Sequence, residues 1–402
     1  MSGKYASSPE WASIKPIPLD DGSKDNDIMP LATIAYPDEY LEATSYLRAV
    51  MAANELSERA LKLTEDIISM NPAHYTVCFN ARIVVTLVGF WPLIGYRHIL
   101  KLESPRTQED FYLTDCLYSL NVLWLYRAKI LFALDKSLDD EFAWLNRVSL
   151  KYLKNYQIWH HRQIIMSSKK HFPTLPAAEP DFLMDMFAQD SKNYHVWTYR
   201  HWLVRHFNLW DSPREIRDVE TLIEQDVRNN SAWNHRYILR FGPRYDEPDA
   251  GMANATKPGS QKGQLDVVDE DLVDSELEYA KSKIVLAPEN RSPWSYARGA
   301  LRAAGRPLSE WKGFASRFVT DETDENGNIT NVHVKSSLAV EWLADVYAEE
   351  AANAEAIRML TLLKEKYDPI RKNYWDYRIR MLSTEEESTR PAAAPAAVSA
   401  SA

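Results

Sequence analysis

The sequence predicts an all-α protein in which helical hairpins stack into a right-handed superhelix. A signature of the form Asn-x-x-x-Trp-x-x-Arg recurs, and its Trp residues are 38 residues apart (Trp159 to Trp197) and then 36 residues apart (Trp197 to Trp233). An amphipathic helical pattern precedes each clean copy. The chain also has 13 Trp and 21 Tyr but only 12 Gly, which suits packed helices better than sheets with many tight turns. A repeat of this length is typical of stacked helical hairpins.

Composition and charge exclude several classes of protein. The net charge of −10 argues against nucleic acid or an anionic membrane as the main partner, because both require clustered positive charge. Cys78 and Cys116 are the only cysteines, so neither a disulfide framework nor a Cys-based zinc site is available. No secretory leader pattern opens the chain, and the apolar stretch 83–96 is short for a membrane span and contains Pro92. We therefore expect a soluble cytoplasmic protein without stable membrane insertion.

The elements are predicted in chain order, beginning with an extended segment. Residues 1–30 are polar and punctuated by Pro and Asp, so we expect a flexible N-terminal arm before a helical-repeat domain over residues 31–383. Helical periodicity begins near Asp38. The segment 57–70 then places an apolar stripe on one helix face, formed by Ala60, Leu61, Leu63, Ile67 and Ile68.

Each repeat is predicted to be a helix, a short turn that ends in Asn, and a second helix that carries the Trp. Ser137 precedes three acidic residues that suit a helix N-terminus, and the segment 212–215 (Ser-Pro-Arg-Glu) has the form of a capping box. The signature Asn fits an N-cap, while Trp and Arg share one helical face on which Arg can contact an aromatic ring. We assign a structural role to the large Trp anchors, namely Trp124, Trp159, Trp197, Trp233 and Trp294.

Two polar segments and a tail interrupt or follow the repeats. Residues 243–272 contain Pro, Gly and Asn and then an acidic run, which predicts a solvated loop. Residues 318–335 surround an Asn-Gly-Asn sequence and predict a second loop. Residues 384–402 are rich in Ser and Glu and then in Ala and Pro, so we expect a disordered tail.

The first signature is divided. Residues 71–77 begin it, but the matching Trp appears only at Trp124. Joining the two halves restores the motif and places Trp124 35 residues before Trp159. Residues 78–123 are therefore an insertion within a motif. One hypothesis is a retained intron or a gene-model artefact, and the competing one is a lineage-specific loop; sequencing of the mature transcript distinguishes them.

The turns before two of the Trp residues are candidate anion-binding sites. They have the sequences Lys154-Asn155-Tyr156-Gln157 and Lys192-Asn193-Tyr194-His195. A Lys beside a helix N-terminus combines a positive charge with free N–H groups and the positive end of the helix dipole, which suits phosphate. Stacking should align these turns along one edge, with Tyr75, Tyr156 and Tyr194 in a row and with Lys154 and Gln157 exposed on the same edge. Solvated turn residues without a function remain the alternative. His160 and His161 are adjacent on opposite helix faces, and no metal-binding motif is present, so we expect this chain to bind no metal.

The repeats resemble those of the protein prenyltransferase α subunits. The likeness extends from the Pro-Ile-Pro-Leu-Asp-Asp-Gly sequence at Pro16, through the helical region that follows Asp38, to about Leu382, and excludes the insertion. The resemblance implies a crescent of helical hairpins around a catalytic β subunit, with which it forms a heterodimer. It also implies that zinc lies in that β subunit and that Mg²⁺ accompanies the isoprenoid diphosphate, with no cofactor bound by this chain.

The resemblance also implies roles for individual residues. Lys154 matches a Lys that contacts the isoprenoid diphosphate and assists its departure, and Tyr156 and Tyr194 match residues of the same catalytic region. The candidates for substrate binding are Gln157, Tyr75, Asn193 and His195. The implied reaction joins the Cys thiolate of a C-terminal Cys-aliphatic-aliphatic-X sequence to C1 of farnesyl or geranylgeranyl diphosphate.

Two other functions compete with an α subunit of the farnesyltransferase and type I geranylgeranyltransferase kind. One is the α subunit of the Rab-type geranylgeranyltransferase, which has the same repeats. The other is a non-catalytic helical scaffold that resembles tetratricopeptide arrays. The sequence does not determine which isoprenoid is transferred, which β subunit binds, or whether a chain that contains residues 78–123 assembles.

Overall fold

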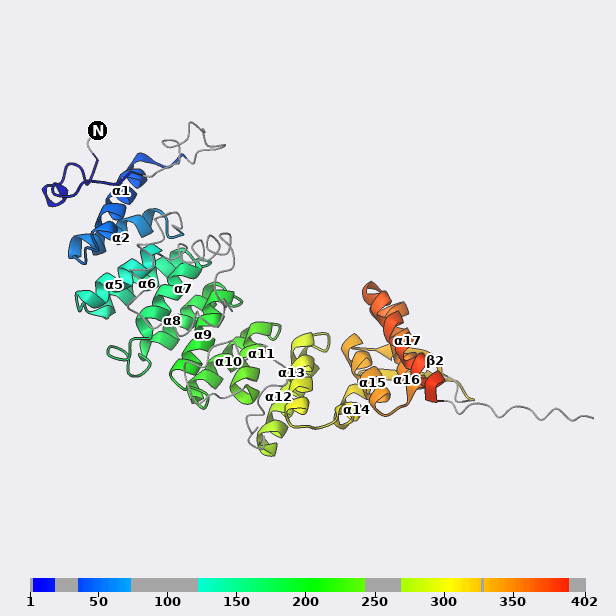
Figure 1. Ribbon diagram of the computed structural model, residues 1–402. Coiled ribbons are helices and arrows are strands. Elements are labelled where there is room, and N and C mark those ends of the chain that lie inside the picture. The colour runs from blue at the N-terminus through cyan, green and yellow to red at the C-terminus, as the bar shows by residue number, and fades with distance from the viewer. Residues whose placement is uncertain (1–2, 19–34, 74–121, 243–268, 327–328, 390–402) are drawn as a thin grey trace, which may run out of the picture. The chain divides into compact units, whose positions relative to one another are not determined.

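The computed structural model describes residues 3–18, 35–73, 122–242, 269–326 and 329–389, and it is predominantly helical (Figure 1). The chain divides into two compact units, the first ending at Trp210 and the second beginning at Asp211. Within each unit, helices that follow one another in the chain pair as antiparallel hairpins. The prediction of an all-α stack of helical hairpins is confirmed. None of the helices within the described ranges is long and apolar enough to cross a membrane.

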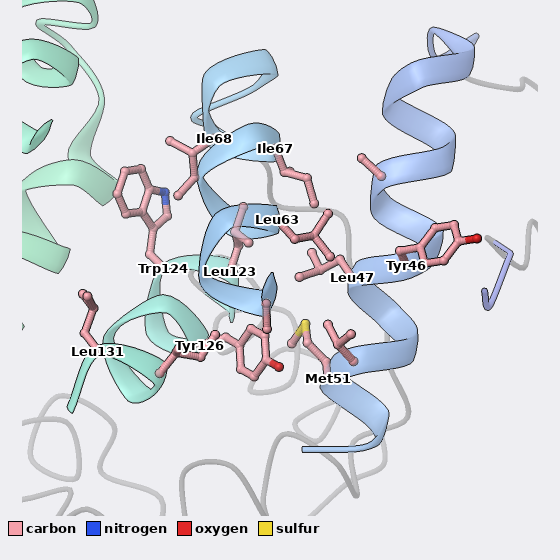
Figure 2. Close-up of a cluster of buried hydrophobic side chains, with 14 of the residues drawn as sticks. Tyr46, Leu47, Met51, Leu63, Ile67, Ile68, Leu123, Trp124, Tyr126 and Leu131 are labelled. Carbon is pink, nitrogen blue, oxygen red and sulfur yellow. The ribbon is translucent and has the colours of Figure 1, made fainter. Parts of the chain in front are cut away.

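The first unit contains a short 3₁₀ helix and seven α-helices among its described residues. These are η1 (Pro9–Trp11), α1 (Asp38–Ala52), α2 (Glu58–Met70), α5 (Val122–Ala133), α6 (Leu138–Lys151), α7 (Tyr156–Met166), α8 (Ala178–Gln189) and α9 (Tyr194–His206). The buried stripe of α2 packs between α1 and α5 in one apolar cluster (Figure 2). In this cluster Leu63, Ile67 and Ile68 are 1% exposed or less, and each such side chain contributes about 1.5–3 kcal/mol when fully buried.

The second unit continues the helical pairs and adds a small sheet. Its described elements are α10 (Pro213–Gln225), α11 (Asn230–Phe241), α12 (Glu270–Leu286), α13 (Arg291–Ala303), η3 (Leu308–Trp311), α14 (Lys312–Ser316), β1 (Val319–Thr323), β2 (Ile329–Val334), α15 (Ser337–Glu349), α16 (Asn353–Leu362), η4 (Leu363–Tyr367), η5 (Pro369–Arg371) and α17 (Lys372–Thr389). Strands β1 and β2 pair antiparallel, with Val319 opposite Val334.

A four-residue turn with one repeated hydrogen bond joins the two helices of each hairpin. The N–H of the signature Asn donates to the carbonyl three residues earlier, at 3.1 Å for Asn155 and Asn193 and at 2.9 Å for Asn229 and Asn290. The side chain of each Asn then accepts hydrogen bonds from backbone N–H groups in the first turn of the second helix. The predicted N-cap role of the signature Asn is confirmed, because these bonds satisfy donors that have no partner within the helix.

The signature Trp residues are buried, and three of them donate a hydrogen bond to the turn that precedes them. The five assigned anchors are 0–4% exposed. The indole Nε1 of Trp197, Trp233 and Trp294 donates to the carbonyl six residues earlier, each at 2.9 Å. This bond ends on the second residue of the four-residue turn. These three Trp residues therefore fix the turns that precede them as well as filling space between helices, whereas the buried Nε1 of Trp159 has no hydrogen-bond partner among the described residues.

Three of the signature Arg residues form buried ion pairs with a Glu on the first helix of the next hairpin. Arg127 binds Glu141 at 2.8 Å, and Arg236 binds Glu276 at 2.6 Å. A third pair joins Arg162 to Glu179. Each guanidinium also lies over an aromatic ring three residues beyond the Glu, on Trp144, Phe182 and Tyr279. The sequence predicted the aromatic contact but not the carboxylate, because periodicity within one helix does not show which neighbouring helix supplies a partner.

The N-terminal segment is packed, which corrects the expectation of a free arm for its described part. Tyr5 and Trp11 are 4% and 5% exposed, and their rings meet edge to face at 5.4 Å. Arg48 of α1 donates to the carbonyl of Ile17 at 2.7 Å. Two aromatic anchors bury enough surface to fix a segment whose remaining residues are polar. The other residues of the predicted arm, 1–2 and 19–30, lie outside the described ranges.

The predicted loops and tail are also shorter than expected. The segment 318–335 contains the β1–β2 hairpin in place of a loop. At the end of the segment 243–272, Asp269 caps α12 and accepts from the N–H of Asp271 at 3.0 Å, because acidic side chains are favourable at a helix N-terminus. Helix α17 continues to Thr389, beyond the boundary predicted at 383.

The capping box predicted at residues 212–215 does not form. Ser212 occupies the N-cap position and Pro213 the first helical position, but the Ser212 side chain accepts no capping hydrogen bond. Glu215 is 3% exposed, and its carboxylate lies 3.0 Å from Nε2 of His235. The Glu215 side chain therefore contacts the buried His235 instead of the backbone N–H of Ser212, which it would bind in a capping box.

The contacts on both sides of residues 78–123 are those of an uninterrupted hairpin. Asn71 ends α2 with backbone angles φ −150° and ψ 91°, nearly the same as Asp190 at the end of α8, with −147° and 91°. The indole of Trp124 donates to the carbonyl of Pro72 at 3.1 Å, although 52 residues separate them. Without the 46 inserted residues this separation becomes six, as for Trp197, Trp233 and Trp294. Asn71 thus holds the position of Asp190, which corrects its interpretation as the start of the signature.

Deletion of residues 78–123 is expected to give a folded chain that is more stable by about 2 kcal/mol. The physical reason is the entropy of chain closure, which grows with the logarithm of the length of a connection between fixed ends. Urea denaturation of the two chains measures the difference. A loss of stability in the deleted chain would show that residues 78–123 make stabilising contacts. This result would count against a retained intron or a gene-model artefact.

Candidate functional site

The turns before α7 and α9 lie next to each other in the first unit. The side chain of Asn193 donates from Nδ2 to the carbonyl of Leu153 at 2.8 Å, which links the second turn to the first. Lys154 follows Leu153 directly, and its Nζ lies 3.1 Å from Oδ2 of Asp190. These two contacts join Leu153 and Lys154 to the turn of the next repeat. We call the residues 153–156 and 190–195 the paired turns.

Lys154, Lys192 and the two tyrosines are the exposed members of the paired turns. The side chain of Lys154 is 80% exposed. Tyr156 and Tyr194 are 42% and 74% exposed, in contrast to the buried Trp three residues after each of them. Two ammonium groups and two aromatic side chains with hydroxyl groups are therefore exposed on the surface. The sequence predicted this exposure for Lys154, Tyr156 and Tyr194.

His195 adds a neutral polar ring beside the ammonium group. Partial burial lowers the pKa of His195, and the positive charge of Lys154 lowers this pKa further. The ring contacts Tyr194 edge to face at 5.5 Å. A neutral imidazole has one N–H donor and one acceptor nitrogen, so His195 can donate to an anion without carrying a charge.

Asn193 and Gln157 lie beneath the surface, which corrects the expectation that Gln157 forms part of the exposed edge. Both residues are 2% exposed. The Oδ1 of Asn193 accepts from the N–H groups of His195 and Val196, at 3.0 and 3.5 Å. Asn193 therefore supports the site by capping α9 and by holding Leu153 through its Nδ2. Sequence spacing placed these residues in the correct turns but could not separate the exposed face from the buried one.

Asn193→Ala is expected to lower the stability of the chain by about 1–2 kcal/mol, because it removes an N-cap and a bond between two repeats. Asn290→Ala is the matched control, since Asn290 caps α13 and donates to the carbonyl of Val227 at 2.7 Å. Urea denaturation should give similar losses for both variants. A loss for Asn290→Ala without a loss for Asn193→Ala would contradict a supporting role for Asn193.

Three further points concern the extent of the site. Tyr75 lies outside the described residues, so its predicted place beside Tyr156 and Tyr194 stays a prediction. A cavity of about 290 Å³ is lined by Arg298, Arg302 and their neighbours in the second unit, and none of the site residues lines it. Within the described ranges no group of three His, Cys, Asp or Glu side chains is placed to hold a metal ion.

The arrangement is an open, positively charged surface. An ion pair at about 4 Å is worth only about 1 kcal/mol in water and several times more where water is excluded. Lys154 is almost fully solvated, so its charge acts strongly on an anion only when a second surface covers it. Asp190 was not among the residues predicted from the sequence. Its position at the start of the second turn, one repeat after Lys154, is the signal that could have indicated it.

Comparisons with known proteins agree with this geometry. The family model described as "Protein prenyltransferase alpha subunit repeat" matches residues 138–169, 176–207 and 212–240, which are the hairpins α6–α7, α8–α9 and α10–α11. The chain is 31% identical over 358 residues to the protein farnesyltransferase/geranylgeranyltransferase type-1 subunit alpha of Candida albicans, covering 88% of this chain and 92% of the relative. The subunit of the same name from Dictyostelium discoideum is 26% identical, with 95% of each chain covered.

A solved structure supports the same assignment. The structure described as Candida albicans protein geranylgeranyltransferase-I complexed with GGPP superposes with a TM-score of 0.67. The two chains are 31% identical, and the match covers 94% of this chain and 99% of the other. The repeats, the hairpin architecture and these similarities over nearly the whole length agree, and the chain belongs to the protein prenyltransferase α-subunit family.

Proposed function

We propose that this chain is the α subunit of a heterodimeric protein prenyltransferase. The enzyme transfers a farnesyl or geranylgeranyl group to the Cys of a C-terminal Cys-aliphatic-aliphatic-X sequence. The observation that carries the proposal is the exposed Lys154 on the paired turns, with Tyr156, Tyr194 and His195 beside it. These groups provide one side of a diphosphate site, and the catalytic β subunit provides the covering surface.

In the proposed reaction the Cys thiolate of the protein substrate attacks C1 of the isoprenoid. A C–S bond forms, the C1–O bond breaks, and the diphosphate leaves with the electron pair. Lys154 stabilises the negative charge that develops on the leaving diphosphate, which is a transition-state role for a fixed cation. The hydroxyl groups of Tyr156 and Tyr194 and the neutral ring of His195 add donors without repelling a cationic neighbour.

The partner and the metals are parts of the same proposal. A zinc ion held by the β subunit would keep the substrate thiol deprotonated, and Mg²⁺ would accompany the diphosphate. The proposal assigns both metals to the partner subunit and the substrate, and it gives this chain no metal ligand. The long matches to type-1 α subunits support this function over the Rab-type enzyme and the non-catalytic scaffold.

Co-expression with candidate β subunits tests the proposal. The purified heterodimer is incubated with farnesyl or geranylgeranyl diphosphate and a short peptide that ends in Cys-aliphatic-aliphatic-X, with a Ser peptide as control. Transfer to the Cys peptide only, and only by the heterodimer, is the expected result. Activity with a Rab-type β subunit alone would favour the Rab enzyme, and a stable heterodimer without transfer to any substrate would contradict an enzymatic role.

A further inference from the structure

The ion pair between Lys154 and Asp190 joins two successive repeats at the proposed diphosphate site. Lys154 is the third residue of the turn before α7, and Asp190 is the first residue of the turn before α9. The Lys154 side chain is 80% exposed and the Asp190 side chain is 23% exposed. The ammonium group is therefore the solvated member of the pair, and the carboxylate is the more deeply placed one.

The carboxylate is held in place by its own turn. Oδ1 of Asp190 accepts from the N–H of Lys192 at 3.2 Å, which leaves Oδ2 for Lys154. The carbonyl of Asp190 accepts from the N–H of Asn193 at 3.1 Å. Asn193 in turn holds the carbonyl of Leu153, the residue before Lys154. Because Asp190 is fixed on both its backbone and side chain, it cannot follow the ammonium group toward a ligand.

We propose that Asp190 sets the resting position of the Lys154 ammonium group and competes with the isoprenoid diphosphate for it. This inference rests on the proposed function. Diphosphate binding requires Lys154 to leave Asp190 or to share its charge, and the fixed carboxylate also repels the incoming anion. Asp190 is a positioning residue that acts through Lys154 and weakens the binding of the diphosphate.

The expected size of the effect follows from the exposure of the pair. Solvent-exposed ion pairs contribute little, equivalent to about a twofold to fivefold change in an equilibrium constant. Removing the charge of Asp190 should therefore tighten binding of the isoprenoid diphosphate by about twofold to fivefold. The gain should shrink as salt is added, because exposed charges are screened. The value of kcat at saturating diphosphate should stay within about twofold, because Lys154 then engages the diphosphate in both proteins.

Asp226→Asn is the matched control for Asp190→Asn. Asp226 ends α10 as Asp190 ends α8, and its Oδ1 accepts from the N–H of Arg228 at 2.8 Å. The control therefore removes a carboxylate with the same backbone contact in the next repeat. Asp190→Glu, which keeps the charge, should bind the diphosphate about as wild type does.

The experiment measures the dissociation constant of farnesyl or geranylgeranyl diphosphate with the intact heterodimer at low and high salt. Tighter binding by Asp190→Asn but not by Asp226→Asn, and no effect of Asp190→Asn in a Lys154→Ala background, is the expected result. Unchanged or weaker binding, or the same gain without Lys154, would overturn the inference. If the wild-type heterodimer transfers the isoprenoid and Asp190→Asn binds like wild type, only the inference fails. If the wild type shows neither binding nor transfer, the proposed function fails instead.

Discussion

Lys154→Ala is expected to lower kcat of the heterodimer by about 100-fold to 1,000-fold, the usual effect of removing one preorganised group that stabilises a developing negative charge. The diphosphate leaves with its negative charge beside the ammonium group of Lys154, and the hydroxyl groups of Tyr156 and Tyr194 cannot replace a full charge. Steady-state prenyl transfer to a short peptide, with the heterodimer at known concentration, measures the change.

The same variant should fold and assemble normally. The Lys154 side chain is 80% exposed, and the loss of an exposed ion pair costs about 1 kcal/mol or less. Lys192→Ala is the matched control, because Lys192 is exposed and holds the same position in the next turn. Its kcat should change by only a few fold. A Lys154→Ala heterodimer that assembles and keeps full turnover would contradict the role proposed for Lys154.

Glu141→Gln is expected to cause a large loss of stability in the first unit. Glu141 is 4% exposed and is bound by Arg127 and by Nε2 of His161, at 2.8 and 2.9 Å. Removing one member of a buried ion pair leaves its partner as an uncompensated buried charge, which costs about 3–5 kcal/mol. Urea denaturation of the isolated chain measures this loss.

The pH dependence of stability provides a second measurement at the same site. Burial raises the pKa of Glu141, but the hydrogen bond from His161 and the charge of Arg127 outweigh burial and lower the pKa from 4.5 to about 2. A depressed pKa means that the stabilisation is fully present above pH 4.5 and is lost as the pH falls toward 2. The shift corresponds to about 3 kcal/mol, in agreement with the cost expected for the substitution. Glu141→Gln should lack this step in its acid denaturation curve.

Glu58→Gln is the control for this prediction. Glu58 pairs with Lys136 at the surface, where the two side chains are 65% and 42% exposed. Its replacement should cost less than about 1 kcal/mol, because water screens the pair. Equal losses for the two variants would show that the buried contacts of Glu141 with Arg127 and His161 do not stabilise the repeats.

Much of the fold could be predicted because its signals are local. The interval between Trp159 and Trp197 and the Asn before each Trp indicated a helix, a turn and a second helix, and the structure has them there. The same local pattern located Lys154 and Tyr194 on turns. It failed where a local pattern is ambiguous: the segment 318–335 is polar but pairs as a hairpin, because strand pairing depends on the partner strand as well as on composition.

The sequence by itself determined the hairpin repeat, the capped helix starts and the two Lys-Asn-Tyr turns, because helical periodicity and capping involve residues within a few positions of one another. Only the tertiary structure decided that Gln157 is buried while Tyr156 is exposed, and that Lys154 meets Asp190. These outcomes depend on how one repeat lies against the next. Lys154 and Asp190 are 36 positions apart in the sequence, but they lie 3.1 Å apart because one hairpin returns the chain to the same edge.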